Sequence, residues 1–135
     1  LSLARKLDRH LEEAGRKLDV LLECNVGQED TKHGWGVSNS VELDCFYADI
    51  EAISSLPNLG IRGLMCMPPL FENEELARPY FIRLRQLRDD LQQKYPMLDW
   101  SALSMGTSAD YAVAVEEGAT FVRVGTAIVG PRHYA

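Results

Sequence analysis

Residues 102–110 read ALSMGTSAD, and residues 120–128 read TFVRVGTAI. Each stretch is an apolar strand that runs into a turn rich in Gly, Ser and Thr and then into the start of a helix. A turn of this kind presents backbone N–H groups to a phosphate. Because the two units follow each other one helix-length apart, we expect their turns to lie side by side and to share one anion site.

Arg123 stands in the second of these strands among apolar neighbours. Strand alternation places Phe121, Arg123 and Gly125 on one face and the two valines on the other, under helices. A buried guanidinium is rare unless an acceptor pairs with it. We expect a ligand to supply that acceptor as a ring nitrogen, a carboxylate or a phosphate. The alternative is an internal ion pair with Glu23, which is similarly placed in its own strand.

The strand before the first turn carries polar and small residues on one face. Strand alternation puts Ser104 and Gly106 on that face and leaves Leu103 and Met105 for the other. A glycine lets the backbone approach an anion closely. Ser108 either bonds phosphate oxygens or caps the following helix. The pairing of the two turns favours the ligand-binding interpretation.

Strands and helices alternate four times along the chain. We predict helices over residues 2–15, 41–55, 73–95 and 108–117, and strands over residues 20–26, 61–67, 100–105 and 120–125. Pro79 predicts a break or a helix start within the third helix. The alternation is typical of an α/β fold whose parallel strands are joined by crossover helices. The special turns all follow strand ends, where barrels and open sheets bind ligands.

The composition is that of one globular domain, with 135 residues of which 46% are hydrophobic and 25% charged. A net charge of -6 and a pI near 5.0 argue against nucleic acid or an anionic membrane as a partner. Because no apolar run reaches the roughly 18 residues that span a bilayer, we expect a soluble, cytoplasmic protein. The three cysteines are far apart and predict neither a disulfide framework nor a zinc site.

Five segments form a set whose order and spacing cover nearly the whole chain: VLLECN at 20–25, TKHG at 31–34, IRGLMCMP at 61–68, LSMGTSAD at 103–110 and VRVGTAIVGPR at 122–132. Together they resemble the pyridoxal phosphate homeostasis proteins. The resemblance implies a barrel of the alanine racemase N-terminal type that holds pyridoxal 5'-phosphate (PLP) at the carboxyl ends of its strands. It further implies that Arg123 faces the pyridine nitrogen and that the phosphate is held by Ser104, Gly106, Ser108, Gly125 and Thr126.

The chain departs from that family in one respect. The resemblance implies a lysine that attaches PLP at the end of the first barrel strand, and none of the four lysines matches it. They are Lys6, Lys17, Lys32 and Lys94, and Lys32 corresponds to the family's own loop lysine. A (β/α)8 barrel usually needs about 200 or more residues, and this chain begins at Leu1 rather than Met.

We therefore expect residues 1–135 to form a single domain, the C-terminal half of a TIM (β/α)8 barrel without the strands that carry the lysine. Four parallel strands without closure leave two unpaired edges. We expect these edges to pair with the N-terminal half of the barrel or to drive self-association. PLP bound by this chain alone should be held weakly and without a covalent bond.

The implied function is PLP homeostasis, in which the protein buffers and delivers the cofactor without catalysis of its own. An arginine at the pyridine nitrogen only donates hydrogen bonds and keeps that nitrogen unprotonated. PLP held in this way is a poorer electron sink, which suits a carrier. The alternative is a PLP-dependent amino-acid racemase or decarboxylase sharing the barrel, and such enzymes usually need a further domain with catalytic groups. A phosphate-binding barrel unrelated to PLP is disfavoured by the set of motifs.

Overall fold

The computed structural model describes residues 1–27 and 33–130. Its strands form one parallel sheet in the order β2-β1-β3-β4-β5. The strands are β1 (Leu18–Asn25), β2 (Trp35–Gly36), β3 (Leu59–Met65), β4 (Ala102–Thr107) and β5 (Phe121–Arg123). The helices are α1 (Ser2–Glu13), α2 (Ser40–Ser54), α3 (Arg78–Lys94), α4 (Tyr111–Glu116) and α5 (Thr126–Val129), with a 3-10 turn η1 (Glu74–Ala77) before α3. The predicted α/β fold with parallel strands is confirmed.

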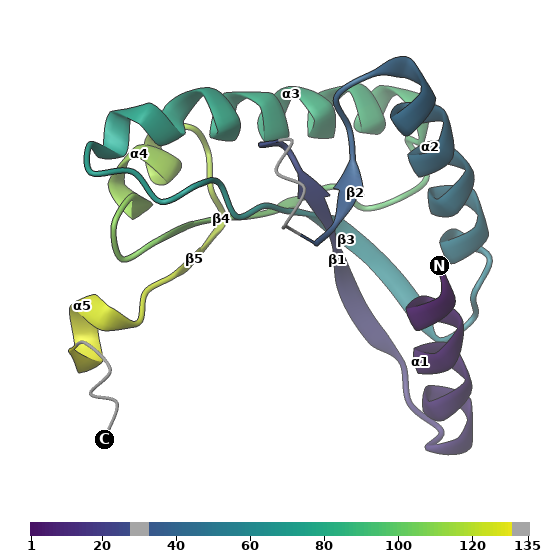
Figure 1. Ribbon diagram of the computed structural model, residues 1–135. Helices are drawn as coiled ribbons and strands as arrows, with labels where there is room; N and C mark the ends of the chain where they lie inside the picture. The colour runs from purple at the N-terminus through teal and green to yellow at the C-terminus, as the bar shows by residue number, and fades with distance from the viewer. Residues whose placement is uncertain (28–32, 131–135) are drawn as a thin grey trace.

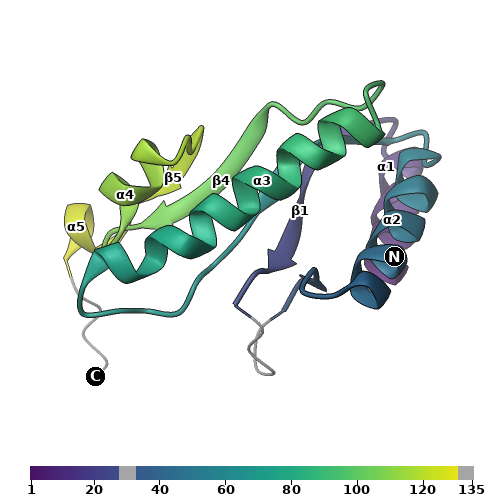
Figure 2. The ribbon, with the colours of Figure 1, turned by 90° about the horizontal axis from the view of Figure 1, so that it is seen from above.

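The helices cover one face of the sheet. Figure 1 shows α3 along one side of the strands and α2 beside it. In the same figure α1 lies near α2, at the end of the sheet away from α5. Seen from above, α1 and α2 lie together at one end, and α4, β5 and α5 lie at the other (Figure 2). No described element covers the opposite face of the sheet between α1 and α5. The sheet is therefore a curved, open part of a barrel whose inner face is bare.

The hydrophobic core lies between the sheet and the helices α2 and α3. Alternate strand positions point into it, and the buried side chains there include Leu22, Cys24, Leu64, Leu103 and Met105. Facing them are Phe46 and Ile50 of α2 and Phe81, Leu84 and Leu91 of α3. In β1 the intervening positions Leu21 and Glu23 lie on the inner face and are half-buried, which is the period of two expected of a strand with two different faces. In β4 every residue from Ala102 to Gly106 is buried, so both of its faces are covered.

A bulge interrupts the pairing of β1 with β3. Val20 pairs with Ile61 but Leu21 pairs with Gly63, so Arg62 is the extra residue. Gly63 has a φ of +148°, and a Cβ there would overlap the carbonyl oxygen of Ala102 on β4. Only glycine fits this position, because the backbones of the two strands approach where a side chain would otherwise stand.

Each predicted strand is found within two residues of its predicted bounds, and two other elements differ from the prediction. The short strand β2 was not predicted, and α4 begins at Tyr111 rather than at Ser108. The break expected near Pro79 is confirmed, because η1 ends there and Pro79 lies in the first turn of α3. Among the described residues, no helix combines the length and apolar character needed to cross a bilayer.

Candidate functional site

Arg123 lies at the carboxyl end of β5 and reaches across the inner face of the sheet. Its Nη1 donates to the Ser104 hydroxyl at 2.6 Å and to the Ser104 carbonyl oxygen at 3.1 Å. Its Nη2 donates to the carbonyl oxygen of Cys66 at 2.9 Å. The guanidinium therefore spans β5, β4 and the end of β3, and these three bonds fix its plane.

The acceptors of Arg123 belong to the protein itself. The sequence led us to expect a ligand as the acceptor, whereas the protein supplies three acceptors itself. Within residues 1–27 and 33–130, no carboxylate forms an ion pair with Arg123, so the alternative pairing with Glu23 is wrong. A guanidinium has five N–H donors, and three are used here. The donor on Nε and one donor on Nη2 remain for a ligand.

Ser108 joins the two Gly/Ser/Thr turns. Its hydroxyl oxygen accepts hydrogen bonds from the Gly125 N–H at 3.0 Å and the Ala127 N–H at 3.2 Å. The two turns therefore do lie side by side, as predicted. Ser108 does not cap α4, because the N-cap residue of that helix is Asp110. The N–H groups at the start of α5 converge on a single oxygen atom, which is the geometry that an anionic oxygen requires.

Asp110 holds the first turn in shape. Its Oδ1 accepts from the Thr107 N–H at 2.6 Å and from the Thr107 hydroxyl at 3.0 Å, and its side chain is buried. The helix predicted over residues 108–117 includes Asp110, and this role of its side chain was not predicted. The signal was present, since an Asp three residues after a turn residue commonly bonds back to that residue's backbone.

Gly106 is needed for a reason that the sequence did not reveal. Its φ is +92°, and a Cβ built there would lie 2.6 Å from the Cβ of Ala114 and 3.1 Å from the Cα of Tyr111. A side chain at position 106 would thus point towards α4 and not towards the face of β4 that carries Ser104. The expectation that Ser104 and Gly106 share a face is wrong, because the positive φ turns Gly106 away from the regular alternation.

Gly125 and Thr126 are exposed at the carboxyl edge of the sheet. A Cβ at Gly125 would meet nothing within 4 Å, so packing does not explain this glycine. The Gly125 carbonyl accepts from the Ile128 and Val129 N–H groups and starts the short helix α5. The structure thus brings Ser104, Ser108, Arg123, Gly125 and Thr126 to one edge, while Gly106 contributes backbone only.

The lysines that the structure describes lie away from this edge. Lys6 is on α1, Lys17 precedes the amino end of β1, and Lys94 ends α3, where its Nζ lies 4.5 Å from the ring centre of Tyr47. Lys32 lies outside the described residues. None of the described lysines therefore stands at the carboxyl end of a strand.

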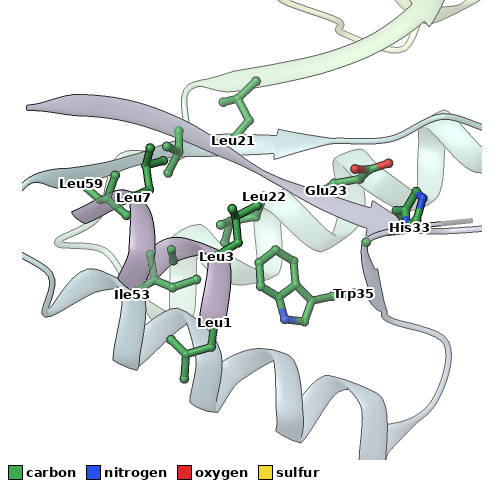
Figure 3. A pocket seen from close by; sticks show the side chains of 13 residues that line it. Leu1, Leu3, Leu7, Leu21, Leu22, Glu23, His33, Trp35, Ile53 and Leu59 are labelled. Atoms are coloured by element: carbon green, nitrogen blue, oxygen red, sulfur yellow. The ribbon is translucent and has the colours of Figure 1, made fainter. Parts of the chain in front are cut away.

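A cavity of about 690 Å³ lies at the opposite end of the sheet, between α1 and the free edge of β1. Six of its thirteen lining residues are leucines, and Glu23 and His33 lie at one end (Figure 3). It contains none of the residues gathered around Arg123. The candidate site therefore lies at the carboxyl edge of the sheet, and the cavity beside α1 is a separate feature.

The sequence and the fold were compared with those of known proteins. The profile of the family described as "Alanine racemase, N-terminal domain" matches residues 1–133. The pyridoxal phosphate homeostasis protein of Aquifex aeolicus is 50% identical over 116 residues, which is 86% of this chain and 48% of that protein. The chain spans about half the length of the curated relatives it matches.

Solved structures of PipY from Synechococcus elongatus share the fold. The structure without PLP superposes with a TM-score of 0.81 at 36% identity and covers 93% of this chain and 55% of that one. The structure with PLP bound superposes with a TM-score of 0.76 at 37% identity, with the same coverage. The sheet described above is thus part of a larger fold of the same topology in these proteins.

Proposed function

The chain belongs to the alanine racemase N-terminal domain family, and from this premise we propose that it binds PLP and serves PLP homeostasis. The relatives named as homeostasis proteins and the PLP-bound structure of PipY support this proposal. The observation on this chain that best supports it is that the Gly125 and Ala127 N–H groups converge on one oxygen atom, that of the Ser108 hydroxyl. Arg123, which precedes Gly125 by two residues, is held in place by Ser104.

The residues present suit the two polar ends of PLP. The Gly125 and Ala127 N–H groups donate to the Ser108 hydroxyl oxygen in the structure. We propose that a phosphate oxygen replaces this acceptor, so that both N–H groups and the hydroxyls of Ser108 and Thr126 donate to the phosphate. Arg123 lies on the inner face of β5, the strand that leads into Gly125, and keeps two donors for the ring. The bonds to Ser104 and Cys66 hold the guanidinium in place before any ligand arrives, which lowers the entropy cost of binding.

The same residues favour a carrier over an enzyme. Bound PLP supplies an electron sink, whose strength depends on a protonated ring nitrogen. A guanidinium donates hydrogen bonds and cannot return a proton to that nitrogen at neutral pH. Its three anchoring bonds also prevent it from turning away. We therefore propose that the chain holds PLP without catalysis, and that its described lysines form no covalent bond to it.

Comparing PLP with pyridoxal, which lacks the phosphate, tests the phosphate site. Equilibrium dialysis or fluorescence titration should show that PLP binds about tenfold or more tightly, as expected when charge-assisted hydrogen bonds to the phosphate are lost. Borohydride treatment of the complex should leave no PLP attached to Lys6, Lys17 or Lys94 in peptide mass spectra. Equal affinities for the two ligands would rule out the phosphate site.

The Arg123→Met variant tests the ring site. It removes three anchoring bonds and both remaining donors, so the affinity for PLP and for pyridoxal should fall together. Arg88→Met is the matched control, since Arg88 lies on α3 and bonds only the neighbouring Asp89 among the described residues. Unchanged PLP affinity in Arg123→Met, or racemisation or decarboxylation of amino acids above that of free PLP, would contradict the proposal.

A further inference from the structure

Arg78, the first residue of α3, is the centre of a cluster of ion pairs. Its Nε and Nη2 donate to the two carboxylate oxygens of Glu75 at 2.7 and 2.8 Å. Its Nη2 also donates to Glu116 at 2.6 Å, and its Nη1 donates to Glu117 at 2.8 Å. A guanidinium has five N–H donors, and four are used here. They join the 3-10 turn η1, the start of α3 and the end of α4, which lies next to this end of α3 in Figure 1.

Glu117 is the most enclosed carboxylate of this cluster. Only 11% of its side chain is exposed, whereas Glu75 and Glu116 are open to solvent. Its second carboxylate oxygen forms an ion pair with Arg85 at 3.2 Å. Because Arg78 and Arg85 are seven residues apart, which is about two helical turns, both lie on the same side of α3. Glu117 therefore fastens the end of α4 to two positions along α3.

The helix α4 depends on such contacts because it is short. It has six residues, of which Val113 and Ala114 are buried. An isolated helix of this length does not form in water, so packing and the contacts at its two ends determine its position. One end forms the ion pairs with Arg78. The other end follows Asp110, which is buried and bonds Thr107.

The position of α4 determines the position of the turn that carries Ser108. We name residues 106–110 the phosphate turn. Ala114 of α4 packs so closely against Gly106 that a Cβ at Gly106 would lie 2.6 Å from the Cβ of Ala114. The Ser108 hydroxyl in turn bonds two N–H groups at the start of α5. A shift of α4 would therefore move the Ser108 hydroxyl relative to these N–H groups.

We propose that Arg78 is a positioning residue for the phosphate turn. Among the described residues its hydrogen bonds go to glutamates alone, so it acts through α4. The inference rests on the proposed function, in which the phosphate turn helps to bind the phosphate of PLP. Arg123, which we assign to the ring, is held instead by Ser104 on β4 and by Cys66 after β3. Loss of Arg78 should therefore weaken the binding of the phosphate and leave the binding of the ring unchanged.

The exposure of the cluster distinguishes this role from a general contribution to stability. Glu75 and Glu116 face solvent, and ion pairs between exposed groups contribute little to the free energy of global unfolding. A short helix can nevertheless open locally at a far smaller cost than the whole domain. We therefore expect a variant without Arg78 to loosen α4 and the phosphate turn while β1 and β3 stay intact.

Titrating the native chain and Arg78→Met with PLP and with pyridoxal tests the proposal. The ratio of the affinity for PLP to that for pyridoxal should fall about threefold or more in Arg78→Met, because only PLP carries the phosphate. Arg78→Lys keeps the charge but not the planar donor fork, so it should recover part of this ratio. Arg88→Met is the matched control, since it removes the same charge from α3 and Arg88 bonds only Asp89 among the described residues.

Glu117→Met distinguishes positioning from simple attraction between charges. It removes the ion pairs of Glu117 with Arg78 and Arg85, but it takes away a negative charge instead of a positive one. If Arg78 positions the turn, the affinity ratio should fall in both methionine variants. If Arg78 only attracts the phosphate, the ratio should rise in Glu117→Met. Circular dichroism establishes that each variant folds, and Glu117→Met tests the role of the cluster should Arg78→Met not fold.

Amide hydrogen exchange of the ligand-free chain gives a second measurement. The amides of residues 111–117 should exchange faster in Arg78→Met than in the native chain, and those of β1 and β3 should not. Equal affinities of the native chain for PLP and pyridoxal would refute the phosphate site and this proposal with it. A native preference for PLP that both methionine variants retain would overturn the role of Arg78 alone. Faster exchange throughout the sheet would make Arg78 a general stabilising residue and would overturn that role as well.

Discussion

At the scale of single residues, Gly106 and Gly125 look alike in the sequence but differ in the fold. Gly106 has a φ of +92° and no room for a Cβ beside Ala114, whereas Gly125 has a φ of -117° and open space. We expect Gly106→Ala to lower the free energy of unfolding by about 1–3 kcal/mol, from backbone strain and overpacking. Urea denaturation followed by circular dichroism measures this change.

The matched control is Gly125→Ala, which should change the free energy of unfolding by no more than about 1 kcal/mol. Equal destabilisation by the two substitutions would show that Gly106 is not constrained by α4. Gly125→Ala keeps the backbone N–H that we assign to the phosphate, so PLP binding should survive in this variant. The two substitutions, Gly106→Ala and Gly125→Ala, thus distinguish a glycine that packing requires from a glycine that we place next to the ligand.

The sequence pattern predicted which side chains lie at the carboxyl edge of the sheet. It did not predict the hydrogen-bond partners of those side chains. Arg123 stood out because it interrupts an apolar strand, and the structure places it on the predicted inner face. Its acceptors include the backbone of Cys66, which is 57 residues away in sequence. Because every residue has a carbonyl group, no pattern of side chains could have indicated that one. The close contact of Gly106 with α4 could not be predicted for a similar reason. Glycine is favoured wherever the backbone closely approaches another group, whether that group is a ligand or a helix.

At the scale of elements, the turn between β4 and α4 depends on Asp110. Replacing Asp110 with alanine leaves the part-buried Thr107 N–H without its acceptor, which should lower the free energy of unfolding by about 1–3 kcal/mol. The turn that carries Ser108 would lose its anchor, so PLP affinity should fall as well. Chemical denaturation and PLP titration of the same preparation measure both effects.

Asp110→Asn keeps an oxygen acceptor at the same position and serves as the control. Its free energy of unfolding should lie within about 1 kcal/mol of that of the native chain. If Asn and Ala were equally damaging, the negative charge rather than the hydrogen bond to Thr107 would hold the turn.

Element boundaries were predicted well in the interior of the fold and poorly at this edge. Apolar runs located β1, β3 and β4, because buried parallel strands are continuously hydrophobic. The helix after β4 starts three residues later than predicted, since Asp110 bonds backward to Thr107 instead of joining the helix. Ser108 looked like a cap by type, but its hydroxyl is directed at α5.

At the scale of the whole molecule, one cluster ties strands together at the amino edge of the sheet. Arg62, the bulged residue of β3, bonds Asp19 of β1 at 2.9 Å and Asp99, just before β4, at 2.7 Å. Hydrogen bonds from Ser101 and then from Arg62 lower the pKa of Asp99 to about 2. In the unfolded chain an aspartate has a pKa of about 3.9.

This difference gives a pH dependence with a definite sign. The folded state favours the ionised carboxylate of Asp99, so its contribution is fully present above about pH 4. It is lost as the pH falls from about 4 to about 2. We expect the urea midpoint to decline over this interval and to decline less steeply in Asp99→Asn.

Asp90→Asn removes one charge from an exposed position on α3 and serves as the control for net charge. Its midpoint should follow the native pH profile. Identical slopes in Asp99→Asn and the native chain would show that the Arg62 cluster contributes nothing to acid stability.

The spacing of the parallel strands also sets the order in which the sheet assembles. Pairing β1 with β3, or β3 with β4, joins residues about 40 positions apart, whereas β4 and β5 are separated only by the short helix α4. Closing a longer loop costs more chain entropy, by about 0.6 kcal/mol for each doubling, and distant contacts slow folding. We therefore expect a chain refolding from denaturant to form β4–α4–β5 first, whereas a chain leaving the ribosome has β1 and β3 available first. Refolding and synthesis begin at opposite ends of the same sheet.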